Sequence, residues 1–206
     1  IIHASNEIIK KNRFRKDKTL YTNNPEGELL SLYVAWNESD EAGFITETAR
    51  EMIERGAPPR EIAVLYRANF QSRVLEEAFL VKNIPYQVLG VRFFERREVK
   101  DVLSYVRAAL NPEGFSDIKR CINTPSRGLG KTTLLRLAAG EKEKLPRATQ
   151  EKVGAFFALL ARIRERALSD TPSNALKFII KESGLEAVLK EGGEDDAERL
   201  ENIKEL

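Results

Sequence analysis

Residues Ile62–Phe79, IAVLYRANFQSRVLEEAF, combine two hydrophobic periods, and the change between them decides the fold. Ile62–Tyr66 is a short apolar run with β-branched residues, which is typical of a strand buried in a parallel sheet. Gln71–Lys82 has apolar residues at helical spacing. The four residues between them, 67–70, stand where the strand would end. Because ligands bind at the carboxyl edge of open α/β sheets, this turn is a candidate binding position.

The side chains of this turn suit a nucleic acid. Arg67 offers forked N–H donors to a phosphate, Asn69 offers a donor and an acceptor, and Phe70 offers a ring on which a base can stack. A purely structural interpretation is also open. In that case Arg67 pairs with Glu61 or Glu76, and Asn69 caps the helix that follows.

The composition describes a highly charged chain that can bury a sizeable core. It has 206 residues, 42% hydrophobic and 32% charged, and a net charge of +2, so it is not uniformly basic. It contains no apolar run long enough to cross a membrane and no signal-peptide pattern, which predicts a cytoplasmic protein without membrane contact. A single cysteine, Cys121, excludes an internal disulfide, and one Cys with one His, His3, gives no basis for a metal site.

Positive charge is concentrated in three clusters, each of which alone is typical of a solvated surface. The clusters are Lys10, Lys11, Arg13, Arg15, Lys16 and Lys18; then Arg92, Arg96, Arg97 and Lys100; then Arg127, Lys131 and Arg136. The chain from Glu191 onwards is acidic. The distribution of charge is therefore a better guide to a partner than its sum.

The order of elements predicts an α/β fold followed by an all-α fold. Strands are expected over 18–22, 29–36, 62–66 and 86–89, and helices over 1–11, 39–55 and 71–82; this alternation is typical of a parallel sheet with covering helices. After Gly90 only helices are expected, over 95–110, 116–122, 132–139, 149–168, 173–183 and 195–206. We therefore predict two domains, 1–93 and 94–206.

Residues 128–133, Gly-Leu-Gly-Lys-Thr-Thr, join two expected helices and suit a phosphate. A nucleotide-binding P-loop is one alternative, but Pro125 stands where its first glycine belongs, a helix instead of a strand precedes it, and no Walker B strand follows. A helix-hairpin-helix element fits better, because glycines let the backbone approach a phosphate and Lys131, Thr132 and Thr133 add donors. A glycine-rich connection without a ligand remains open.

Three stretches in order resemble motifs of the UvrD/PcrA/Rep family of superfamily 1 DNA helicases. They are LYRANFQSRVLEEAF, NIPYQVLGVRFFERREVKDVLSYVRAALNP and INTPSRGLG, and the resemblance covers nearly the whole chain. It implies part of a RecA-like 2A domain, with a partial parallel sheet, followed by most of the helical 2B domain inserted into it. Leu129 and Val91 depart from the family, which usually has isoleucine and often glycine at these positions.

The resemblance also implies which residues contact DNA. It places four residues on single-stranded DNA: Arg67, Asn69, Arg73 and Lys100. Together with the donors of the loop, it predicts a duplex-binding set of Arg127, Gly128, Leu129, Gly130, Lys131, Thr132 and Thr133. The expected partner is DNA at a junction of single strand and duplex.

The sequence contains no Walker A motif, no Asp-Glu Walker B motif and no arginine-finger motif. ATP hydrolysis needs these groups, so we expect no catalytic residue, no metal site and no cofactor in this chain. We expect it to be a piece of a longer ATP- and Mg²⁺-dependent 3′ to 5′ helicase of DNA repair or replication, working with the rest of 2A and with domains 1A and 1B. Three other interpretations stay open: a stand-alone helix-hairpin-helix DNA-binding module, an NTPase using residues 130–132, and a helical platform for protein partners.

Overall fold

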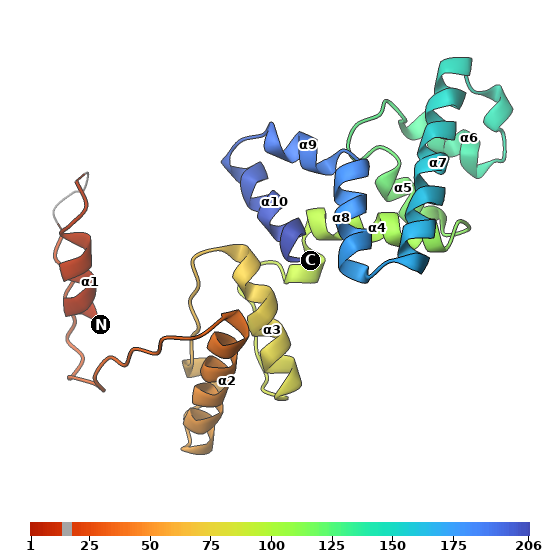
Figure 1. Ribbon diagram of the computed structural model, residues 1–206. Helices are drawn as coiled ribbons and strands as arrows, with labels where there is room; N and C mark the ends of the chain where they lie inside the picture. The colour runs from red at the N-terminus through yellow and green to blue at the C-terminus, as the bar shows by residue number, and fades with distance from the viewer. Residues whose placement is uncertain (14–17) are drawn as a thin grey trace. The chain divides into compact units, whose positions relative to one another are not determined.

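A computed structural model describes residues 1–13 and 18–206, and these residues divide into two compact units, Ile1–Glu41 and Ala42–Leu206 (Figure 1). Arg15 and Lys16 of the first basic cluster lie outside the described residues. The helices are α1 (Ile2–Ile9), α2 (Glu38–Glu54), α3 (Ser72–Val81), α4 (Arg97–Leu110), α5 (Phe115–Cys121), α6 (Lys131–Ala138), α7 (Arg147–Ser169), α8 (Pro172–Glu182), α9 (Leu185–Lys190) and α10 (Glu194–Glu205). Short 3₁₀ turns are η1 (Pro59–Glu61), η2 (Asn69–Gln71), η3 (Phe93–Glu95) and η4 (Lys142–Lys144).

The first unit holds α1, an extended stretch and the start of α2. The Asn6 side chain ties α1 to that stretch, because its amide donates to the Leu20 carbonyl at 3.1 Å and its oxygen accepts from the Leu20 N–H at 3.3 Å. Near the start of α2, the Tyr33 hydroxyl donates to the Asp40 carboxylate at 3.0 Å. Burial is slight, and Trp36 is 93% exposed.

The predicted parallel sheet is wrong, because no strand forms anywhere in residues 1–13 and 18–206. Segments 18–22, 29–36, 62–66 and 86–89 lack helix as predicted, and Ile62 has extended dihedrals, φ −97° and ψ 125°. Apolar β-branched residues favour extended backbone, but a strand exists only through hydrogen bonds to a neighbouring strand. In the described part of the chain, these segments do not form such a ladder with one another.

The region from Ala42 to Gly90 packs two helices against its extended segments. A small core of Ala49 on α2, Phe79 on α3 and Ile84 is covered by Ile45, Ile53, Ile62, Val64 and Tyr86. The rings of Phe79 and Tyr86 lie 5.8 Å apart. Side chains on the other side of the extended segments are exposed to solvent: Leu65 is 92% exposed and Leu89 is 93% exposed.

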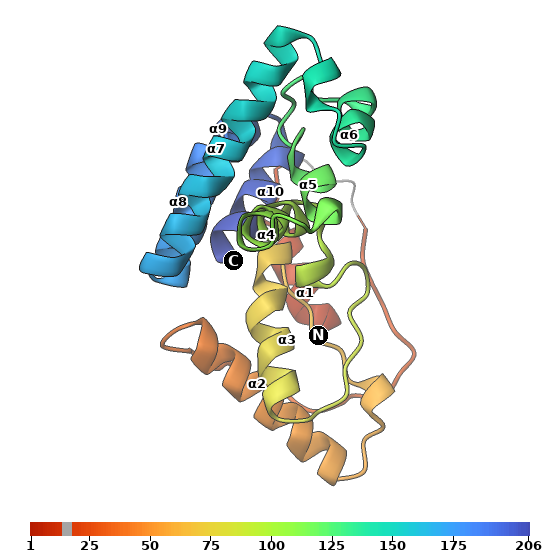
Figure 2. The same ribbon diagram turned by 90° about the vertical axis from the view of Figure 1, so that its right-hand side faces the viewer.

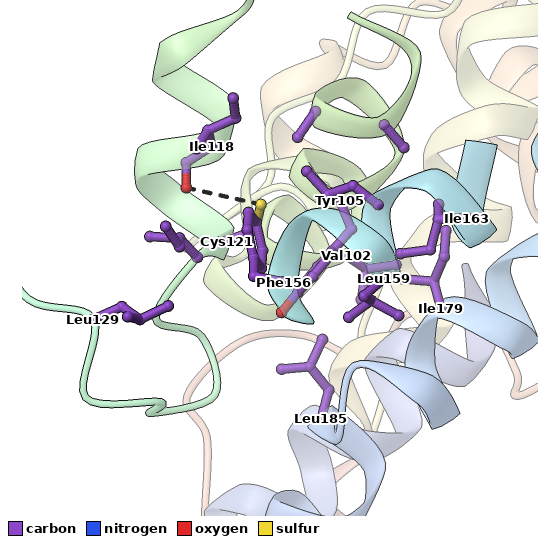
Figure 3. Packing of buried hydrophobic residues seen from close by; sticks show 14 of the residues in the cluster. Val102, Tyr105, Ile118, Cys121, Leu129, Phe156, Leu159, Ile163, Ile179 and Leu185 are labelled. Carbon is purple, nitrogen blue, oxygen red and sulfur yellow. Dashed lines mark hydrogen bonds between the residues drawn. The ribbon is translucent and has the colours of Figure 1, made fainter. Parts of the chain in front are cut away.

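The helical region that follows confirms the predicted helices. Helix α4 contacts α5, α7, α8 and α10, and it supplies Val99, Val102, Tyr105 and Ala108, all fully buried. Figure 3 shows this core from close by, with side chains of α4, α5, α7 and α8 meeting each other. Because α4 packs against four other helices, it is the central helix of the region.

Two pairs of the later helices pack closely together, α7 with α8 and α9 with α10. Figures 1 and 2 show α7 and α8 running side by side, and α9 and α10 follow. Thr171 caps α8 by accepting a hydrogen bond from the Asn174 N–H, with Pro172 at the first helical position. Helix α9, Leu185–Lys190, is absent from the sequence prediction. None of the helices in residues 1–13 and 18–206 is long and apolar enough to cross a membrane.

Candidate nucleic-acid interface

The hairpin between α5 and α6 is held by one asparagine and one leucine. The Asn123 side-chain oxygen accepts from the N–H of Arg127 at 2.7 Å and from the N–H of Leu129 at 3.1 Å. Leu129 is fully buried and belongs to the same cluster as Ile118 and Cys121 of α5 (Figure 3). The leucine therefore anchors the loop, while its flanking glycines stay at the surface.

The exposed part of the hairpin presents unpaired backbone donors. Gly128, Gly130, Lys131 and Thr132 are exposed, and α6 starts at Lys131 without a side-chain cap. Among the described residues, no group accepts from the N–H of Lys131, Thr132 or Thr133. These are the orphan donors of a helix N-terminus, and together with the positive end of the helix dipole they favour an anion.

The two glycines differ in what they require. Gly128 has φ +72°, a conformation that L side chains rarely adopt. Gly130 has φ −84° and ψ −166°, and a Cβ placed on it would meet no atom within 4 Å. Gly130 thus leaves open space for an approaching ligand, whereas Gly128 permits the turn itself.

The duplex-binding set splits between surface and interior. Gly128, Gly130, Lys131 and Thr132 share the exposed surface of the hairpin, while Leu129 and Thr133 are buried. A further cation lies beside this surface: a Cβ on Gly128 would be 3.2 Å from the Nζ of Lys152 on α7. Nothing in the sequence pattern singles out Lys152, since only the fold brings it to the loop.

Arg127, the remaining member of that set, is turned toward the protein. Its guanidinium donates to four backbone carbonyls and lies over the rings of Tyr105 and Phe156. Burial raises the pKa of the neighbouring Tyr105 hydroxyl well above its usual value, despite the Arg127 charge. The phenol therefore stays neutral, and it donates to the Thr124 carbonyl at 2.5 Å.

The turn after the extended segment 62–66 is held by the side chain of Gln71, a residue for which the sequence predicts no role. Its side-chain oxygen accepts from the N–H of Arg67 at 3.1 Å and of Ala68 at 2.8 Å. The Arg67 side chain is exposed, and within the described residues it forms no ion pair with Glu61 or Glu76. The structural alternative for Arg67 thus finds no support in these contacts.

Asn69 and Arg73 face carboxylates of α10. Asn69 lies within η2 and does not cap α3; its amide donates to Glu198, and its oxygen accepts from Arg96 at 3.0 Å. Arg73 donates to Glu205 at 2.7 Å and also to Glu77, its neighbour on α3, at 2.9 Å. Both side chains are therefore already bound to anionic groups, which a phosphate would have to displace.

Lys100 lies apart from these contacts, in a basic hollow on α4 and α5. The hollow has a volume of about 510 Å³ and is lined by Phe94, Lys100, Arg107, Ser116, Asp117, Lys119 and Arg120. Of its cations, Arg120 is engaged by Asp101 at 2.8 Å. The hollow is positively charged and includes one exposed aromatic ring, Phe94, at its wall.

Residues 130–132 do not have the structure of a nucleotide-binding P-loop. Gly130-Lys131-Thr132 follows helix α5 and a loop, so the strand that a P-loop requires is missing there. Across residues 1–13 and 18–206, no group of three or more His, Cys, Asp or Glu side chains could hold a metal ion. The described cations and amides can bind anions, but they form no nucleotide cradle.

Taken together, the chain folds into a helical region with a glycine hairpin whose exposed amides suit an anion, preceded by a smaller helical and extended region. Comparison with known proteins agrees: the profile of the UvrD-like helicase C-terminal domain matches residues 1–205. The chain therefore belongs to the UvrD-like helicase C-terminal domain family, which confirms the resemblance.

Relatives along the whole chain are DNA helicases. The chain is 40% identical to DNA helicase II of Haemophilus influenzae and 38% identical to DNA helicase II of Escherichia coli, each over 224 residues. It is 33% identical over 223 residues to the ATP-dependent DNA helicase PcrA of Staphylococcus aureus. All of this chain is covered, but only 31%, 31% and 30% of these relatives, so it spans about a third of their length.

Proposed function

We propose that this chain is the DNA-contacting part of an ATP-dependent DNA helicase that moves 3′ to 5′ on single-stranded DNA and unwinds duplex. One observation carries the proposal: in a chain of this helicase family, the hairpin 128–132 exposes two glycines, a lysine and the unpaired amides that open α6. Backbone donors of this kind grip a phosphate backbone and position a duplex without reading its sequence.

Two further parts of the interface complete the proposal. Arg67, Asn69, Arg73 and Lys100 contact the single strand, and Lys131, Thr132 and Thr133, with Arg127 and Leu129 shaping the loop, serve the duplex. The exposed guanidinium of Arg67 and the basic hollow around Lys100 support the first assignment. The exposed Lys152 beside Gly128 extends the duplex-binding surface.

ATP and Mg²⁺ would act elsewhere in the whole protein. Hydrolysis of ATP requires a phosphate-cradling loop and carboxylates that hold magnesium, and the residues described for this chain form neither. We therefore propose that this chain alone hydrolyses no ATP and couples to the motor through the remaining parts of such a helicase, in repair or replication.

A second candidate function is a stand-alone helix-hairpin-helix DNA-binding module without a motor. The same hairpin supports it, because duplex contact by residues 128–132 needs no ATPase. Walker motifs in the coding sequence that adjoins this chain would exclude the stand-alone module, and their absence would favour it.

The test is equilibrium binding to a 3′-tailed duplex and to the matching single strand over a range of salt. Gly130→Ala adds a methyl group into open space at the predicted phosphate position without backbone strain. Loss of one charge-assisted hydrogen bond, worth about 1.5–3 kcal/mol, predicts a roughly tenfold or greater weakening on the tailed duplex, with single-strand binding unchanged.

Gly193→Ala is the matched control for this variant. Gly193 caps α10 with φ −84° and ψ −164°, nearly the dihedrals of Gly130, and a Cβ there also meets nothing within 4 Å. If both variants bind the tailed duplex like wild type, the hairpin is only a connection and the proposal fails. In Lys131→Gln, loss of one phosphate contact should lower the salt slope by roughly 1.

A further inference from the structure

Arg127 gathers the carbonyl groups at the C-terminal ends of two helices. Its Nη1 donates to the carbonyls of Cys121 and Ile122, where α5 ends, at 3.3 Å each, and to that of Pro125 at 3.1 Å. Its Nη2 donates to the carbonyl of Ser183, the C-cap of α8, at 2.7 Å. The last carbonyls of a helix lack intrahelical partners and carry partial negative charge, so one guanidinium satisfies the ends of both helices.

The faces of this guanidinium are also covered. Its central carbon lies 5.8 Å from the ring centre of Tyr105 on α4 and 5.9 Å from that of Phe156 on α7. Both rings are buried, and cation–π attraction is stronger where water is excluded. The Arg127 side chain thus contacts α4, α7 and the C-terminal ends of α5 and α8.

The backbone of the hairpin after Arg127 is held in place by side-chain hydrogen bonds. Asn123 accepts from the N–H of Arg127 itself and from the N–H of Leu129, so the main chain is held on both sides of Gly128. Gly184, which follows the α8 carbonyl bound by Arg127, lies against Pro125 of the same loop. The hairpin is therefore fastened to a helix end 56 residues further along the chain.

We infer that Arg127 is a positioning residue: it orients the amides at the start of α6 toward DNA through the hairpin and does not itself contact a phosphate. Its two terminal nitrogens already donate to backbone carbonyls. The inference rests on the proposed duplex contact and defines a separate role within it.

The test uses Arg127→Lys, which keeps the positive charge but loses the fork that reaches both helix ends. If Arg127 positions the hairpin, the variant binds the 3′-tailed duplex about five- to tenfold more weakly and the single strand like wild type. Hydrogen exchange rises in the free protein at the N–H groups of Leu129 and Leu134, which in wild type donate to the Asn123 side chain and to the Gly130 carbonyl. A phosphate contact by charge alone would instead leave Arg127→Lys close to wild type in both measurements, which would overturn the inference.

Two further variants secure the interpretation. Arg136→Lys is the matched control, because Arg136 lies in the last turn of α6 and donates to the Lys144 carbonyl, not to the ends of α5 and α8; it should bind and exchange like wild type. Asn123→Ala removes the other support of the hairpin, the acceptor of the Arg127 and Leu129 N–H groups. It should also weaken duplex binding, leave single-strand binding unchanged and speed hydrogen exchange. It keeps the test possible if Arg127→Lys folds poorly. A normal exchange rate in folded Asn123→Ala would also count against the inference.

Failure of the proposed function gives a different result. If wild type and Gly130→Ala bind the tailed duplex equally, the hairpin is not a duplex contact, whatever Arg127 does. If Gly130→Ala weakens duplex binding while Arg127→Lys and Asn123→Ala do not, the duplex contact stands and the positioning role of Arg127 is wrong.

Discussion

The region from Ala42 to Gly90 (the first region) and the helical region from Arg97 onwards (the second region) differ in how their backbone N–H and C=O groups are paired and in the size of their cores. The helices of the second region pair their own backbone groups and bury a continuous core around α4. In the first region only α2 and α3 do so, and they bury little more than Ala49, Phe79 and Ile84. The comparison teaches that helices pair their backbone groups locally, whereas extended segments depend on partner strands, which the described residues do not provide.

The largest expected effect tests the difference in core size. Phe156→Ala removes a ring that is 2% exposed and packs against Tyr105 in the large core, so it should cost about 3–5 kcal/mol of unfolding free energy. Phe79→Ala, in the small core, should cost roughly half as much, because its surroundings can collapse more easily. Urea unfolding followed by circular dichroism measures both, and equal losses would break the comparison.

A smaller effect on stability is expected from the two glycines of the hairpin, of which only Gly128 has a left-handed backbone conformation. Gly128→Ala forces a side chain into a left-handed conformation and should destabilise the protein by about 1–2 kcal/mol. Gly130→Ala should change stability by less than about 0.5 kcal/mol, as is usual for surface positions. Thermal unfolding of the two variants provides the measurement. Equal destabilisation by the two variants would contradict the expectation that only Gly128 needs the backbone freedom of glycine.

Contact between the two regions gives the next prediction. Glu198→Gln removes the negative charge that accepts the hydrogen bond of Asn69, and single-stranded DNA should then bind about two- to fivefold more tightly because a nearby repulsive charge is lost. Glu201→Gln removes one charge from the same helix, but Glu201 pairs with Lys204 instead, so it should have a weaker effect. Fluorescence anisotropy at low salt would measure both affinities.

The Asn69→Ala background provides the control for this prediction. If Asn69 contacts the single strand, Glu198→Gln loses its specific effect once Asn69 is removed. A gain of the same size in both backgrounds would show that only the net charge of α10 matters.

The smallest effect concerns pH and one carboxylate of the helical region. Burial raises the pKa of Asp101 above its ordinary value of 3.8, although Arg120 and Arg97 oppose the shift. As pH rises above about 3.8, the unfolded chain loses this proton first, so the contribution of Asp101 to stability falls until the folded-state pKa is passed.

Asp101→Asn should therefore remove a decline in melting temperature that wild type shows just above that pH. Melting temperatures of both proteins, taken from pH 3.5 to 6, give the difference. A wild-type stability that rises relative to Asp101→Asn over this window would mean that ion pairing with Arg120 outweighs burial.

Sequence predicts well what neighbouring residues determine. The helices of the second region follow from apolar residues at helical spacing, and the hairpin follows from Gly128 and Gly130, because these signals act within a few residues. Helix α9 escaped prediction since its six residues, between Gly184 and Gly192, are too few to show a period. Local sequence patterns were thus sufficient to predict the helices that are long enough to show a period.

Other features depend on residues that are distant in sequence. The apolar run Ile62–Tyr66 indicates an extended backbone but not whether a partner strand is present. Arg127 resembles a phosphate ligand until the carbonyl of Ser183 is found beside it. Asn69 and Glu198 are 129 residues apart, so their contact follows only from the folded chain.

The single cysteine of the chain has a practical consequence for spectroscopy. Cys121 is fully buried, its thiol donates weakly to the Ile118 carbonyl (Figure 3), and burial raises its pKa to about 12. Almost no reactive thiolate exists near neutral pH. A pair of cysteines introduced at exposed positions, one on α2 and one on α7, could therefore be labelled with fluorophores or spin labels without first removing Cys121. The distance between the labels would then report directly how the two regions move when DNA is added.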